Sequence, residues 1–92
     1  MQLDSRKVQS SLTAKGFRPA QTHHTFYVFH TSAGKKTPVR TKTSHGAPTL
    51  NDHLIGCMAK QCRLLKPEFV DLVSCSLSGA DYEAKLKAQG DI

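Results

Sequence analysis

Alternating apolar and polar positions predict two neighbouring strands in the first half of the chain. Residues 24–31, "HTFYVFHT", are rich in the aromatic and β-branched side chains that strands favour. Residues 37–43, "TPVRTKT", alternate Val and Thr with Arg and Lys, which is typical of a strand with one polar face. The intervening "SAGKK" contains a glycine and indicates a turn, so we expect a hairpin. Residues 17–22, "FRPAQT", contain a proline, which restricts them to an edge strand.

Helical spacing occurs on both sides of these strands. In residues 3–16, Val8 and Leu12 lie four positions apart and share a helix face. Asp4 or Ser5 is expected to accept hydrogen bonds from the free amides at the start of this helix. Further helices are predicted in residues 49–65, 66–75 and 78–90.

This order of elements predicts a small α+β domain. A chain of 92 residues is too short to cover both faces of a three-stranded sheet, so we expect helices on one face only. Along the middle strand, Phe26 and Val28 point to one face, and Tyr27 and Phe29 point to the other. Both faces are therefore apolar, and one pair is left for an edge, a partner or a ligand.

The net charge of +6 is unevenly distributed. The first 66 residues contain eleven Lys and Arg and two Asp, whereas residues 67–92 contain two Lys and five Asp and Glu. The first two-thirds of the chain therefore carries a positive field, which attracts phosphate backbones and also acidic proteins. Charge alone does not distinguish these two kinds of partner.

The histidines and cysteines lack the spacing of a metal site. Zinc needs three or four converging ligands, but His24 and His30 are separated by roughly 20 Å if the strand is extended. Cys57 and Cys62 lie five residues apart in a predicted helix and face nearly opposite directions. We therefore expect no metal and no cofactor, and we interpret these two and Cys75 as core filler in a reducing compartment.

Nothing in the chain predicts export or membrane insertion. No charged start is followed by an apolar stretch, as in a secretion signal. No apolar run approaches the roughly 18 residues that span a membrane. We therefore expect a cytoplasmic protein without a membrane partner.

A histidine at a strand edge beside several cations suits acid–base chemistry on RNA. Imidazole changes charge near neutral pH and exchanges protons with ribose and phosphate oxygens. Cleavage of RNA through its own 2′-hydroxyl needs such a group, together with cations that stabilise the charged transition state, and needs no metal. The cations near the predicted strands are Lys35, Lys36, Arg40 and Lys42. On composition alone, however, a histidine at a strand start is more often a surface or capping residue.

A helix near the N-terminus is followed by "KGF" at 15–17 and "HTFY" at 24–27, and then by a Gly turn and a strand. This order of motifs resembles that of HicA toxins. A longer branch of HicA-like proteins carries "GKKT", "TKTSHG" and "MAKQ", which stand here at 34–37, 41–46 and 58–61. The chain therefore resembles the HicA family over essentially its whole length.

The resemblance implies a fold similar to the double-stranded-RNA-binding domain: a helix, a three-stranded antiparallel sheet and a helix, with extra C-terminal helices. It implies one HicA-like domain over residues 1–92, with a core over about 4–65 and a helical extension over about 66–92. It also implies ribosome-independent cleavage of mRNA and neutralisation by a HicB-like antitoxin. The family's catalytic histidine opens the second strand, before one residue of any kind and two apolar ones. His24 matches this pattern, and His23 matches it one residue out of register.

His45 stands in "TSHG", between the last predicted strand and the next helix. It is expected either to hold a phosphate near the helix N-terminus or to stabilise the loop without touching RNA. The predicted RNA-binding residues are thus Lys35, Lys36, Arg40, Lys42 and His45.

Two non-catalytic functions on the same fold remain open. A double-stranded-RNA-binding module would use the same positive field to recognise the shape of an A-form duplex. The acidic last helix argues against that function, because such modules use a basic helix start. A protein-interaction domain would dock an acidic partner through an exposed Tyr27 and Phe29 beside Arg40.

Overall fold

One helix precedes three antiparallel strands and three helices follow them, within the residues that the structure describes. The computed structural model describes residues 2–21, 25–42, 48–74 and 76–92. The strands are β1 (Leu3–Asp4), β2 (Phe17–Gln21), β3 (Thr25–His30), β4 (Lys36–Lys42) and β5 (Thr49–Leu50). The helices are α1 (Ser5–Ala14), α2 (Asp52–Gln61), α3 (Lys66–Val73) and α4 (Gly79–Gln89). The chain is therefore a small α+β domain, as predicted.

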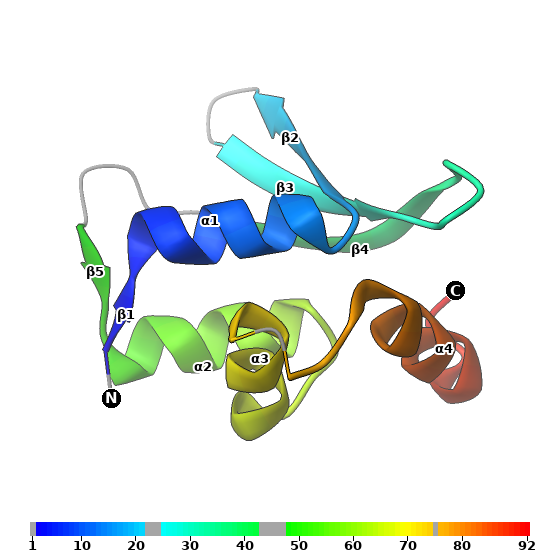
Figure 1. The fold of residues 1–92 in the computed structure, drawn as a ribbon. Helices are drawn as coiled ribbons and strands as arrows, with labels where there is room; N and C mark the ends of the chain where they lie inside the picture. The colour runs from blue at the N-terminus through cyan, green and yellow to red at the C-terminus, as the bar shows by residue number, and fades with distance from the viewer. Residues whose placement is uncertain (1, 22–24, 43–47, 75) are drawn as a thin grey trace.

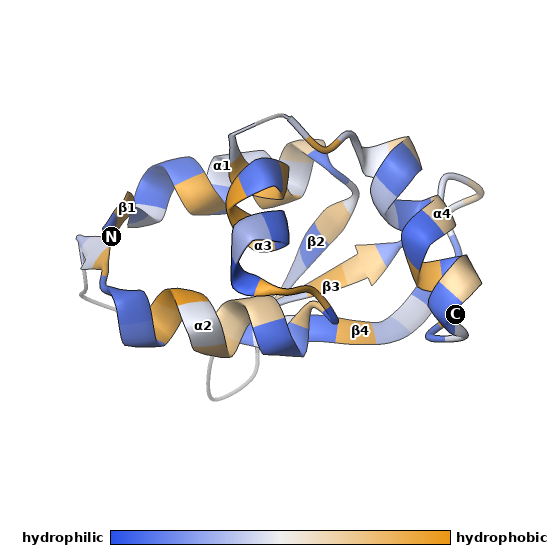
Figure 2. Cartoon of the chain, turned by 90° about the horizontal axis from the view of Figure 1, so that it is seen from below, coloured by the Kyte–Doolittle hydropathy of each residue, from blue (hydrophilic) through white to orange (hydrophobic). Residues whose placement is uncertain are grey.

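A three-stranded sheet forms one layer of the domain, and the helices form the other. β3 is the central strand and pairs antiparallel with both β2 and β4. Figure 1 shows the helices on one side of this sheet, and Figure 2 shows α3 between α1 and α2. Helix α1 contacts β2 and α2 contacts β4, so each helix covers one half of the same sheet face. The predicted hairpin is confirmed, and β2, which contains Pro19, is the predicted edge strand.

The ends of the helices agree with the prediction in α1 and differ in α2. The Asp4 carboxylate caps α1 and accepts the Arg6 amide at 2.9 Å. The predicted helix over residues 49–65 is shorter at both ends. Thr49 and Leu50 form β5 and Asn51 caps the helix start, and Arg63, just after the helix end, adopts a left-handed φ of 64°. The short pairing of β1 with β5 is not predicted, since a strand of two residues has no alternation to recognise. This pairing holds the starts of α1 and α2 together.

Three aromatic rings from distant parts of the chain meet in the core. Phe17 of β2, Phe29 of β3 and Tyr82 of α4 lie with ring centroids 5.0 to 5.7 Å apart. The Tyr82 hydroxyl donates a hydrogen bond to the Cys62 carbonyl at 2.7 Å, and its burial raises the pKa of this hydroxyl far above its ordinary value. α4 is therefore part of the core, fixed by stacking and by one buried hydrogen bond.

The central strand buries the pair of side chains that the protein-interaction hypothesis placed at the surface. Tyr27 is 8 % exposed and Phe29 is 1 % exposed, and both belong to the core beneath the sheet. The Tyr27 hydroxyl donates to Gln9 of α1 at 3.2 Å. The expectation that Tyr27 and Phe29 form an exposed docking pair is therefore wrong. Helix α1 offers Tyr27 apolar cover and also a polar partner for its hydroxyl, so that side of β3 is buried.

We expect Tyr82→Phe to lower the free energy of unfolding by about 1 to 2 kcal/mol, because the change removes the donor to the Cys62 carbonyl inside the core. Urea unfolding followed by circular dichroism measures the change. Tyr27→Phe is the matched control, since its hydrogen bond to Gln9 is longer and only partly buried. We expect Tyr27→Phe to lower the free energy of unfolding by less than half as much as Tyr82→Phe does. Equal losses in the two variants would show that burial of the Tyr82 bond contributes nothing extra.

Candidate nucleic-acid interface

The upper face of the sheet carries no helix in the described part of the chain (Figure 1). The strand register aligns two rows of side chains across β2, β3 and β4 on this face, since residues directly opposite one another share a face. The first row is Arg18, Val28 and Arg40, and the second is Ala20, Phe26 and Lys42. Further along β4, Lys36 and Pro38 alternate with buried residues and are exposed. We call these residues the open face: Arg18, Ala20, Phe26, Val28, Lys36, Pro38, Arg40 and Lys42.

The open face is hollowed at its centre. The hollow has a volume of about 400 Å³ and is lined by apolar groups of Ala20, Phe26, Val28 and Pro38, with Lys36, Thr37 and Arg40 around them. The Arg40 guanidinium lies over the Phe26 ring, 5.1 Å from its centroid, as a cation–π pair. Val28 is 5 % exposed, so it contributes little surface to the hollow although no described helix lies over it. The hollow thus combines flat apolar surface with fixed positive charge.

No carboxylate neutralises the cations of the open face among the described residues. All seven Asp and Glu of the chain are described, and the four that form ion pairs do so with cations outside the open face. These pairs are Asp52 with Lys66, Glu68 with Lys85, Glu83 with Lys87, and Asp91 with Arg63. Arg18, Lys36, Arg40 and Lys42 therefore present four positive charges to solvent on one face, which suits phosphate groups.

Side-chain hydrogen bonds hold β4 near both ends. The Thr37 hydroxyl donates to the Phe29 carbonyl at 2.7 Å, where the pairing of β3 with β4 becomes irregular. Near the other end, the Thr41 hydroxyl and the Lys42 amide both donate to the Gln61 side-chain oxygen, at 2.7 and 3.1 Å. The motifs "TKTSHG" and "MAKQ" therefore touch each other, and Gln61 fixes the strand from which Lys42 projects.

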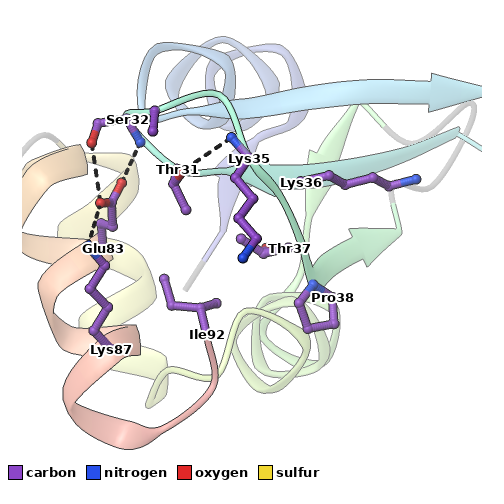
Figure 3. Close-up of a pocket in the computed structure, with 10 residues that line it drawn as sticks. Thr31, Ser32, Lys35, Lys36, Thr37, Pro38, Glu83, Lys87 and Ile92 are labelled. Atoms are coloured by element: carbon purple, nitrogen blue, oxygen red, sulfur yellow. Dashed lines mark hydrogen bonds and ion pairs between the residues drawn. The ribbon is translucent and has the colours of Figure 1, made fainter.

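The structure brings together three of the predicted RNA-binding lysines and arginines and separates the fourth. Lys36, Arg40 and Lys42 share the open face. Lys35 lies in the turn before β4, and Figure 3 shows its side chain extending toward Thr37 and Ile92, whereas Lys36 points away from them. Lys35 therefore belongs to a second hollow, of about 380 Å³, between the turn and the C-terminal residues.

The turn beside this second hollow is fixed by an acid from α4. The Glu83 carboxylate accepts the Ser32 amide at 2.6 Å and also the Ser32 hydroxyl (Figure 3). The bond from the Ser32 amide, with that from Lys87, holds the pKa of Glu83 below its ordinary value. Glu83 of the C-terminal helix thus holds the tip of the hairpin instead of neutralising the open face.

The predicted histidines His23, His24 and His45 lie outside the described residues. Their roles stay predictions. The described ends of the neighbouring strands are informative, however, because Phe26 pairs with Lys42. The start of β3, directly after residue 24, and the end of β4, three residues before 45, therefore lie at the same end of the sheet.

Arg18 and Phe26 are members of the open face that the sequence did not place in the site. Arg18 stands in the same row as Arg40, but this is visible only once the register of β2 on β3 is known. Phe26 and Val28 form one of the two apolar pairs of the middle strand, and the sequence did not show which pair is buried. The alternation of Phe26 with Tyr27 was the one available signal, because it places the two side chains on opposite faces of the sheet.

The cysteines differ in their surroundings. Cys62 is fully buried, and burial raises its pKa to about 12, so its interpretation as core filler is confirmed. Cys57 is exposed, and its sulfur lies 3.8 Å from His53 Nε2, one turn away on the solvent side of α2. For Cys57 that interpretation is wrong, and Cys75 lies outside the described residues. The described residues contain no group of three or more side chains that could hold a metal ion.

Comparisons with models of protein families, with curated proteins and with solved structures found no match. Among the described helices, none is long and apolar enough to cross a membrane. The features of the molecule that bear on function are therefore the open face and the residues next to it.

Iodoacetamide is expected to modify Cys57 in the native protein and to modify Cys62 at least about 100-fold more slowly, because Cys62 is buried and protonated. Trypsin cuts after Lys60, so the two cysteines fall in different peptides for mass spectrometry. In urea the two rates should converge. Similar rates in the native protein would contradict the burial of Cys62.

Proposed function

We propose that the protein is a toxin endoribonuclease of the HicA type, which cleaves mRNA in the cytoplasm and is neutralised by a HicB-like antitoxin. The observation that carries this proposal is the open face, where four cations lack any carboxylate partner among the described residues. Phosphate groups are the ligands that such a surface attracts most generally. The order of one helix, three antiparallel strands and a helix supports the proposed likeness to the double-stranded-RNA-binding domain.

The proposed reaction uses the RNA's own 2′-hydroxyl and needs no metal. The 2′-hydroxyl must lose one proton to a general base, and the leaving 5′-oxygen must receive one from a general acid. His24 fills one of these two roles. The 2′-oxygen bonds to phosphorus, the bond from phosphorus to the 5′-oxygen breaks, and a 2′,3′-cyclic phosphate and a 5′-hydroxyl remain. Lys36, Arg40 and Lys42 stabilise the charge on the phosphorus oxygens.

The position of His24 in the sequence supports its proposed role. It directly precedes Thr25, where β3 begins, and it is two residues from Phe26 on the open face. In the strand predicted from the sequence, positions 24 and 26 have the same parity and position 23 has the opposite one. This favours His24 over His23. His45 comes three residues after Lys42, the last residue of β4, and its proposed role is to hold a phosphate.

The test of catalysis is incubation of unstructured RNA with the purified protein in EDTA, with products resolved on a gel. We expect cleavage by the parent protein and by His23→Ala, and a loss of at least about 100-fold with His24→Ala, in line with the usual contribution of a general acid or base. A substrate with a single 2′-deoxy group at the cut site should resist cleavage there. Equal activity of His24→Ala and the parent would refute the assignment.

The test of the open face is a pair of charge reversals. Arg40→Glu and Lys60→Glu change the net charge equally, but Lys60 lies on the exposed side of α2. Arg40→Glu should weaken RNA binding at least about tenfold more than Lys60→Glu, because it removes a phosphate contact and adds repulsion. Equal weakening in filter binding would mean that only net charge matters. RNA bound without cleavage by the parent protein would support a non-catalytic RNA-binding module instead.

A further inference from the structure

The hollow of the open face has the two features that a nucleotide requires. Its walls are apolar side chains of Ala20, Phe26, Val28 and Pro38, which suit a flat ring. Its rim carries Lys36 and Arg40, with Lys42 in the neighbouring row, and these suit phosphates. A purely electrostatic phosphate site needs cations and no aromatic ring. The presence of the Phe26 ring among the cations therefore points to a ligand group other than phosphate.

We infer that the open face binds single-stranded RNA, with one unpaired base stacked on the Arg40 guanidinium that Phe26 holds in place. This inference rests on the proposed function for RNA as the ligand and specifies the form of RNA that the face accepts. Unpaired bases stack on aromatic rings and on guanidinium planes in many RNA-binding proteins. Here the two groups are already paired, at 5.1 Å from guanidinium carbon to ring centroid.

The pairing of Arg40 with Phe26 reduces the cost of ordering the arginine. A free arginine at the surface loses side-chain entropy when a ligand immobilises it. The Phe26 ring lies beneath the guanidinium, so part of that loss has already occurred in the free protein. Arg40 is exposed to solvent, which makes its guanidinium accessible to a base.

The cations along β4 define a path for the RNA backbone. Lys36 and Lys42 are six residues apart on this strand, which corresponds to roughly 20 Å at the rise of an extended chain. Arg40 stands between them on the same face. An extended single strand can follow this line, with one base turned into the hollow and phosphates on either side.

A duplex does not fit this arrangement. In an A-form helix the base faces are stacked on one another and the major groove is too narrow for side chains to enter. A duplex would therefore meet the cations of the open face and gain nothing from Phe26 or from the plane of Arg40. The preference for single strands should thus depend on these two side chains.

The experiment measures binding with cleavage blocked. A fluorescent 12-nucleotide RNA, 2′-O-methylated throughout and free of self-pairing, lacks the attacking hydroxyl. Its anisotropy is titrated with the full-length protein, alone and after annealing to its complement. We expect the single strand to bind at least about tenfold more tightly than the duplex at the same salt concentration.

Two conservative variants separate stacking from charge. Arg40→Lys keeps the charge and loses the plane, and Phe26→Leu keeps an apolar side chain and loses the ring. Each should weaken single-strand binding about tenfold, the scale of one stacked base, and change duplex binding less than about twofold. Their salt dependence should equal that of the parent. Lys42→Ala is the matched charge variant, and it should reduce the log–log salt slope by about 0.7.

The outcomes distinguish this inference from the proposed function. Duplex binding as tight as single-strand binding would overturn the inference and leave RNA as the ligand. Equal losses for both forms with Arg40→Lys would also overturn it, since they would indicate a simple phosphate contact. If the parent protein binds neither form, the proposed function fails together with the inference. Arg40→Lys is at an exposed position, so its result does not depend on the folding of Phe26→Leu.

Discussion

The packing of Tyr82 against Phe17 and Phe29 determines which face of the sheet is available to a ligand. It brings the last helix against the two strands at one side of the sheet, and the hydrogen bond to the Cys62 carbonyl holds it to the end of α2. A chain of this size can cover only one sheet face. The same contacts that complete the core therefore leave Phe26 and its neighbouring cations uncovered, so the core and the candidate site have a common physical origin.

The acids of the chain explain why the positive field of the open face persists. Glu83 holds the hairpin tip through Ser32, and Glu68 accepts the Leu65 amide and pairs with Lys85. These carboxylates stabilise turns and helix ends, where they accept backbone amides, and they lie away from the open face. The uneven charge seen in the sequence therefore corresponds to two separate places in the structure. Acidic side chains stabilise a turn and a helix start, and the cations of β2 and β4 face solvent.

Local patterns predicted the elements well, and the burial of the sheet faces less well. Alternation identified β3 and β4, and the proline identified the edge strand, because these signals act within a few residues. The choice between Phe26 and Tyr27 depended on Gln9 of α1, which is far away in the sequence and invisible to alternation. The position of Arg18 beside Val28 and Arg40 likewise needed the cross-strand register. Cys57 was wrongly predicted to be in the core, because α2 buries the side of the helix that carries Ile55 and Met58.

Gln61 links the sequence motifs "TKTSHG" and "MAKQ" in physical terms. Its side-chain oxygen accepts hydrogen bonds from the Thr41 hydroxyl and from the Lys42 amide. Gln61 of "MAKQ" therefore fixes the last two residues of β4, which are the first two residues of "TKTSHG". Thr41 is fully buried, and without Gln61 its hydroxyl would lose this partner inside the protein, at a cost of about 1 to 3 kcal/mol. The two motifs therefore need each other for stability, independently of any contact with RNA. Since Lys42 pairs with Phe26, this bond also holds in place the end of the open face to which the chain segments carrying His24 and His45 are attached.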